Sequence, residues 1–134
     1  MAVANNEIQV TWSAAHFKSV SAGASEASDA MSFSATAFDA MVTLKADNSS
    51  TPASGDTVDV YALLSCGDPD GAADDEFPND DSDGIFLARL DTNADDPAIA
   101  TVALPVSKAV KIFAKNNASS HAITVSACIN EKTA

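Results

Sequence analysis

The 134-residue chain has few aromatic residues, few basic residues and little glycine, proline or cysteine. It contains 7 lysines and arginines against 19 aspartates and glutamates, which gives a formal net charge of −12. Sequence-independent binding to nucleic acid or to anionic lipid depends on clustered basic residues, so this charge argues against both partners. The sequence also lacks any apolar run near the roughly 18 residues of a membrane-spanning helix. Neither a nucleic acid nor a membrane is therefore expected as a partner.

The two cysteines, Cys66 and Cys128, are too few for a disulfide scaffold, and their spacing matches no zinc-binding pattern. Cys66 falls on an apolar strand face and Cys128 on a polar one, which argues against a bond between them. The first ten residues contain no lysine or arginine, unlike the start of a secretory signal. We therefore expect two reduced thiols in a chain made in a cytosol, with no cofactor.

Hydrophobic residues make up 46% of the chain, too many for a disordered protein, and the length fits a single domain over residues 1–134. The clearest pattern is a period of two, in which apolar and polar residues alternate, as in Glu7–Ser13 and His121–Glu131. A strand shows this pattern when one face meets a core and the other meets water. Residues 19–30 lack the pattern and are expected to form a loop or an irregular edge. About eight runs separated by turn residues predict an antiparallel, jelly-roll-like β-sandwich: 7–13, 29–35, 37–46, 57–66, 84–90, 99–106, 108–115 and 121–131.

The longest connection is the acidic loop, residues 67–83, which is too long for a hairpin and too polar for a core element. The segment 66–96 contains 11 acidic residues and one basic residue, so it supplies −10 of the net charge. We expect this loop to point into solvent or to meet a basic patch on a partner.

Several carboxylates in one loop also raise the hypothesis of a calcium site, because calcium prefers multiple oxygen ligands. The sequence support for the candidate ligands is weak. A run that begins at Asn79 imitates the first positions of an EF-hand loop, but Leu90 stands where the twelfth position needs glutamate. This poor register favours a solvated loop over a metal site, and both interpretations stay open. The candidate ligands are Asp68, Asp70, Asp81 and Asp83.

No catalytic signature is present, and the chain is not expected to be an enzyme. His121 and Cys128 are seven residues apart along one strand, which separates them by more than about 20 Å. Cys66 and His121 remain compatible with a thiol–imidazole pair, although nothing in the sequence supports one.

Large apolar residues on nominally outward strand faces suggest a protein–protein contact instead. The alternative is that loops of the same chain cover them. Exposed aromatic residues would also suit a carbohydrate-binding or adhesion module, with or without calcium, although Trp12 lies on the apolar face of its strand. The candidate contact residues are Met41, Tyr61, Leu63 and Phe113.

The segments SGDTVDVYALLSCGDPDG, GIFLARLDTN and KAVKIFAKNNASSHAITVSACINE carry a resemblance to a known family. From Ala37 to Glu131 the layout resembles the small β-sandwich cement or decoration proteins of tailed-bacteriophage capsids. The resemblance implies a virion structural protein, made in the host cytoplasm, that binds the major capsid protein on the outside of the head. It implies a homotrimer or another homo-oligomer and no catalytic residues. Residues 1–6 are then expected to form an N-terminal arm that docks on a neighbour.

Overall fold

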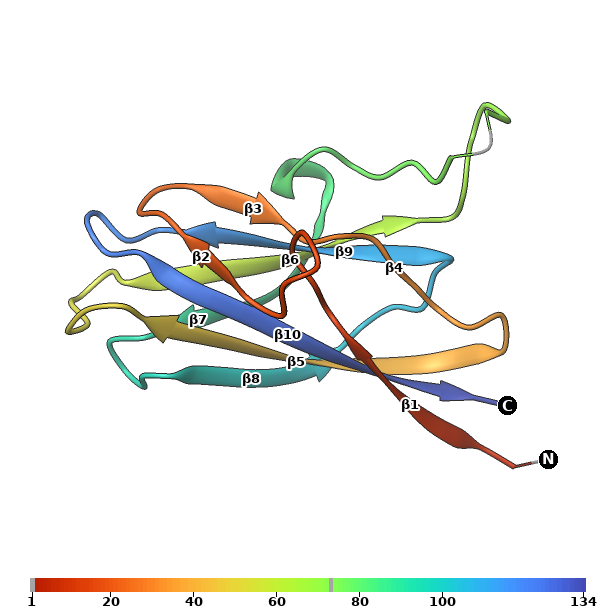
Figure 1. Cartoon of the computed structure of the whole chain (residues 1–134), viewed down its shortest axis with the longest axis horizontal. Helices are drawn as coiled ribbons and strands as arrows, with labels where there is room; N and C mark the ends of the chain where they lie inside the picture. The colour runs from red at the N-terminus through yellow and green to blue at the C-terminus, as the bar shows by residue number, and fades with distance from the viewer. Residues whose placement is uncertain (1, 73) are drawn as a thin grey trace.

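The computed structural model describes residues 2–72 and 74–134, which form two antiparallel β-sheets packed face to face (Figure 1). The first sheet has the strand order β1-β10-β5-β8, and β2 also pairs with β10. The second sheet has the order β3-β9-β6-β7, and β4 also pairs with β9. The predicted antiparallel β-sandwich is therefore confirmed, with ten strands in place of about eight. Their bounds are β1 Ala4–Gln9, β2 Lys18–Val20, β3 Ser25–Ala27, β4 Met31–Ser32, β5 Ala37–Asn48, β6 Thr57–Ser65, β7 Ile85–Asp91, β8 Ala98–Ala103, β9 Ala109–Asn116 and β10 Ile123–Thr133.

The two strands that the sequence pattern did not predict, β2 and β3, lie in the region expected to be irregular. Each is three residues long, which is too short to show a period of two. They pair with β10 and β9 respectively, so each extends one sheet at its edge. A short 3-10 helix, η1 (Asp81–Asp83), precedes β7. None of the helical structure in the described residues has the length and apolarity needed to cross a membrane.

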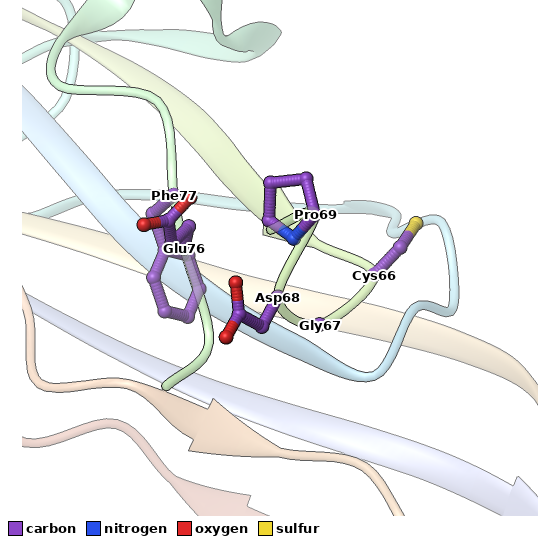
Figure 2. Close-up of a pocket in the computed structure, with 6 residues that line it drawn as sticks. All are labelled: Cys66, Gly67, Asp68, Pro69, Glu76 and Phe77. Atoms are coloured by element: carbon purple, nitrogen blue, oxygen red, sulfur yellow. The ribbon is translucent and has the colours of Figure 1, made fainter. Parts of the chain in front are cut away.

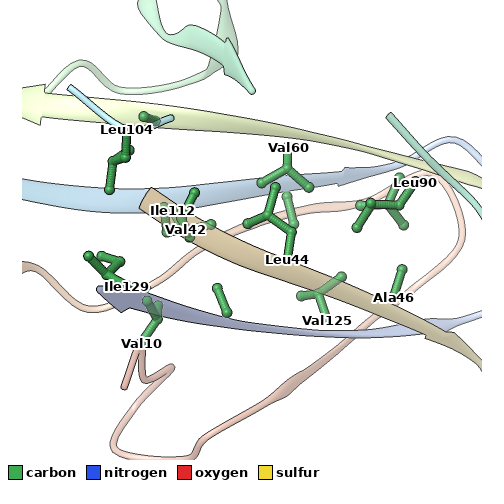
Figure 3. Close-up of a cluster of buried hydrophobic side chains, with 14 of the residues drawn as sticks. Val10, Val42, Leu44, Ala46, Val60, Leu90, Leu104, Ile112, Val125 and Ile129 are labelled. Carbon is green, nitrogen blue, oxygen red and sulfur yellow. The ribbon is translucent and has the colours of Figure 1, made fainter. Parts of the chain in front are cut away.

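Alternating side chains of the long strands fill the space between the sheets (Figure 3). On β5 the even-numbered residues from Ala40 to Ala46 are buried, and the odd-numbered residues between them are exposed. Burying one valine, leucine or isoleucine contributes roughly 1.5–3 kcal/mol, so the alternation itself drives the two layers together. The central core residues include Val42, Leu44, Val58, Val60, Val110, Ile112, Val125 and Ile129.

The N-terminal residues belong to the body of the sandwich. Ala4 pairs with Thr133, and the register continues without a break to Gln9 and Cys128. Residues 4–6, expected as an arm for a neighbouring molecule, thus begin an edge strand of the chain's own first sheet. This pairing brings the two ends of the chain side by side (Figure 1).

Candidate functional site

A hollow of about 470 Å³, lined mainly by apolar side chains, lies at one corner of the sandwich. We call it the apolar hollow. It forms where β5 and β7 begin and β8 ends. Three large side chains on its lining stay exposed: Phe38 at 56%, Ile85 at 44% and Phe86 at 56%. The full lining is Phe38, Asp39, Ile85, Phe86, Leu87, Ala103, Leu104, Pro105 and Val106.

A β-bulge determines how Phe86 reaches the surface. Val60 pairs with Ala88, but the next residue, Tyr61, pairs with Phe86, so Leu87 is left without a partner in the ladder. A bulge of this kind bends the strand and redirects the side chains beside it. The ring of Phe86 then lies against the ring of Tyr61, with 5.5 Å between their centroids.

The lining of the apolar hollow offers binding surface and little chemistry. Asp39 is the ionisable residue among those that line it, and Lys132 lies 4.0 Å from its carboxylate. Exposed apolar patches of this kind mark contact surfaces in soluble proteins. The geometry suits the side chains of another macromolecule better than it suits a reacting small molecule.

The acidic loop lies over the outer face of the second sheet, the side away from the first sheet (Figure 1). Three lysines on or next to β9 hold it there. Lys108 Nζ is 2.7 Å from Asp75 Oδ1, and Lys115 Nζ is 3.6 Å from Asp81 Oδ2. Lys111 Nζ lies 4.7 Å from the centroid of the Phe77 ring. Most of the described residues of the loop are exposed, as expected for a loop that points into solvent, and the loop also meets a basic row on its own sheet.

The acidic loop and β7 cover some of the residues that the sequence predicted to contact another protein. Leu63 and Phe113 are buried, and the end of the loop at Gly84 packs so tightly on Leu63 that a Cβ there would come within 3.0 Å of it. Tyr61 is half-buried between the rings of Phe86 and Phe113. Met41 alone of the four predicted residues is exposed, on the first sheet. Of the two interpretations the sequence left open, packing within the chain holds for Leu63 and Phe113.

The structure divides the four candidate calcium ligands into two places. Asp68 and Asp70 come together with Glu76, so that one carboxylate oxygen from each lies within 4.8 Å of the others. Figure 2 shows Asp68 and Glu76 beside a hollow of about 320 Å³, with the Cys66 thiol turned away from the Asp68 carboxylate. Asp81 and Asp83 lie in η1, where Asp81 pairs with Lys115.

The first of these groups has the donor type that calcium binds, but within the loop the donors also serve local turns. The Asp70 N–H donates to Asp68 Oδ1 at 3.0 Å, and the Ala72 N–H donates to Asp70 Oδ1 at 3.3 Å. Glu76 was not among the sequence candidates, because it joins the group only through the return of the loop, where its N–H bonds to the Gly67 carbonyl. Calcium takes six to eight oxygen ligands, so three carboxylates form at most a partial shell.

The imidazole of His121 has a structural partner. Its Nδ1 lies 2.6 Å from Oδ2 of the buried Asp56, and that carboxylate also accepts hydrogen bonds from Asn48 and the Ala53 N–H. The hydrogen bond from His121 is the main cause that lowers the pKa of Asp56, and burial opposes it. Cys66 lies at the opposite end of the β6–β9 pair from His121. The thiol–imidazole pair that the sequence left open is therefore absent.

Comparison with known proteins identifies no family for the chain. No protein-family model matches, and no curated protein matches. The solved structure titled "Family 16 Carbohydrate Binding Module-2" aligns at a TM-score of 0.48 and 12% identity over 87% of this chain and 79% of that one. The structure titled "Crystal Structure of FLHE" aligns at 0.44 and 11% over 98% and 96%. The fold is an antiparallel β-sandwich with an exposed apolar corner.

Proposed function

We propose that the chain is a capsid decoration protein of a tailed bacteriophage, which binds the outside of the assembled head and stabilises it by non-covalent contacts. The observation that carries the proposal is the apolar hollow, where Phe38, Ile85 and Phe86 stay exposed side by side. The resemblance of residues 37–131 to capsid decoration proteins supplies the partner, the major capsid protein.

Cementing a shell requires no chemistry, only a stiff body with a surface that fits its partner. Aromatic side chains in a partly formed pocket are the residue type that dominates protein–protein contacts. Full burial of each large apolar side chain contributes roughly 1.5–3 kcal/mol. Many copies on one shell then multiply a contact that is modest for each molecule.

Charge adds a requirement on the partner. Asp39 lines the apolar hollow, and the acidic helix η1 immediately precedes β7, whose first two residues form part of the lining. A docking surface on the shell is therefore expected to present apolar side chains flanked by basic groups, because like charges across a contact are costly.

The carbohydrate-binding alternative needs an exposed aromatic ring that can stack on a sugar, and Trp12 and Tyr61 do not provide one. Trp12 is buried in the core, and the ring of Tyr61 is enclosed by Phe86 and Phe113. Neither residue offers a flat exposed platform for a sugar ring.

The proposal expects a major capsid gene next to this chain's gene, and the test is co-sedimentation with empty shells assembled from the capsid protein that it encodes. Wild-type protein is expected to sediment with shells to saturation, and Phe38→Asp and Phe86→Asp are expected to lose at least about tenfold in affinity, as one lost apolar anchor predicts. Phe17→Asp is the matched control, because Phe17 is similarly exposed and lies outside the apolar hollow, just before β2. Absence of saturable binding by the wild-type protein would overturn the proposal.

A further inference from the structure

The outer face of the first sheet carries a continuous groove. Three hollows of about 240, 190 and 250 Å³ adjoin one another along β5 and β10. The first and second share Lys45 and Ser126 in their linings, and the second and third share Thr43 and Cys128. We call the three together the polar groove.

The polar groove is long enough for a chain-like ligand. Along β5 its lining extends from Asp47 to Asp39, which corresponds to about 26 Å at about 3.3 Å per residue. Its floor consists of side chains from the middle of the sheet, where β5 and β10 already pair along their full length. A peptide that binds by adding a strand needs a free sheet edge, which this floor does not provide.

Hydroxyl and amide groups are interspersed with apolar surface along the floor of the polar groove, where Met41 is an exposed apolar side chain. Thr43 and Thr101 share a hydrogen bond of 2.8 Å between their hydroxyl oxygens. Burial is the main cause that raises the pKa of the Cys128 thiol, so this group is neutral near pH 7. The other uncharged polar residues along the lining are Gln9, Thr124, Ser126 and Asn130.

The charges of the lining balance. The positive charges of Lys45 and Lys132 equal in number the negative charges of Asp39 and Asp47, and Lys132 lies 4.0 Å from Asp39. A site that selects a strongly charged ligand concentrates the opposite charge. The polar groove does not, and it therefore suits a neutral ligand that is rich in hydroxyl groups.

An aromatic ring stands at one end of the polar groove. Phe17 is 60% exposed and lines the first hollow beside His16. The segment before it is fixed by a two-residue turn between Trp12 and Ala15, which bond to each other through both backbone groups. The backbone before Phe17 thus follows a defined turn, and the exposed ring offers an apolar platform next to polar groups.

We propose that the polar groove is a binding site for a neutral oligosaccharide, with Phe17 stacked on one sugar ring and the hydroxyl and amide side chains bonding to the others. A site that combines apolar surface with several polar groups that fix orientation matches a ligand whose rings have apolar faces and polar edges. The site is separate from the apolar hollow and does not depend on the proposed docking to a shell.

Isothermal titration calorimetry and amide chemical-shift mapping test this site with cellohexaose, laminarihexaose, xylohexaose and mannohexaose as probes. At least one probe is expected to bind saturably and to shift amide signals of β5 and β10 around Lys45 and Ser126. Phe17→Ala is expected to weaken that binding about fivefold or more, as the loss of one stacking contact predicts. Thr43→Val should weaken it further while the unfolding temperature shows that the variant is folded.

Phe38→Ala is the matched control, because it removes an equally exposed phenylalanine from the apolar hollow, and it should bind as the wild-type chain does. Failure of all four probes to bind, or unchanged affinity of Phe17→Ala, would overturn the proposal. So would a dimer of this chain whose contacts cover the groove, or saturable binding of a glycine–serine peptide there without any sugar binding.

Discussion

At the scale of single residues, the turn that precedes Phe17 carries strain that glycine would relieve. Ser13 and Ala14 adopt positive φ values of 48° and 68°, in a two-residue turn that usually contains Asn-Gly. Ala14→Gly is therefore expected to raise the free energy of unfolding by about 1 kcal/mol, measured by urea denaturation. Ala94→Gly, at a position without positive φ, is the control and should lower it.

Asp56 gives a second prediction at this scale, on the dependence of stability on pH. Its pKa in the folded chain is lowered, mainly by the hydrogen bond from His121. A carboxyl whose folded pKa is depressed contributes stability that is present above its unfolded pKa, about 3.9, and is lost as the pH falls through the folded value. Stability should therefore decrease below about pH 4.

Asp56→Asn tests the contribution directly. At pH 7 the variant should be about 2 kcal/mol less stable, because it loses a buried charge-assisted hydrogen bond. The difference from the wild-type chain should shrink below about pH 4, as denaturant unfolding at several pH values would show. A difference that stayed constant down to pH 2 would mean that the charge of Asp56 contributes nothing. Asp47→Asn, at an exposed position of β5, is the control.

At the scale of elements, the contact between the acidic loop and β9 explains which apolar residues are hidden. Lysines 108, 111 and 115 meet Asp75, Phe77 and Asp81 across the outer face of the second sheet. Each contact is partly exposed and individually weak, typically about 0.2–1 kcal/mol, so several small contributions together hold the loop.

Replacing Lys111 and Lys115 by glutamine should therefore loosen the acidic loop without unfolding the sandwich. We expect faster amide hydrogen exchange across residues 67–84 and a loss of global stability of no more than about 1 kcal/mol. High salt should accelerate exchange of the same segment in the wild-type chain, because it screens the ion pairs. Lys45→Gln, on the first sheet, is the control; equal exchange in both variants would contradict the role of the β9 lysines.

The strands were predictable because their signal is local, whereas the surfaces depend on how distant elements meet. Alternation over residues 57–65 indicates that Tyr61 and Leu63 face away from the core, and it is correct on that point. It does not show that the loop end at Gly84 returns to cover Leu63. The lysines on the polar face of β9 were the sequence feature that could have predicted this contact, because their charge is opposite to that of the acidic loop. No local sequence pattern predicts the polar groove, because its lining residues come from separate strands.

At the scale of the whole molecule, the binding features occupy different parts of the surface. The acidic loop covers the second sheet, the polar groove follows the first, and the apolar hollow lies at a corner. A molecule bound to a shell through the corner would place η1, at the end of the acidic loop, next to the contact. The net charge of −12 also affects self-association, because copies of the chain repel one another unless salt screens the repulsion.

The expected homo-oligomer therefore has a distinctive dependence on salt. Copies that associate must overcome mutual repulsion, and the Debye length falls from about 30 Å at 0.01 M salt to about 3 Å at 1 M. Sedimentation velocity should thus show association that increases with sodium chloride. Phe86→Asp should associate as the wild-type chain does once salt screens its added charge, because the apolar hollow is the surface assigned to the shell. Association that weakened with salt would contradict the prediction and would indicate ion pairs between copies.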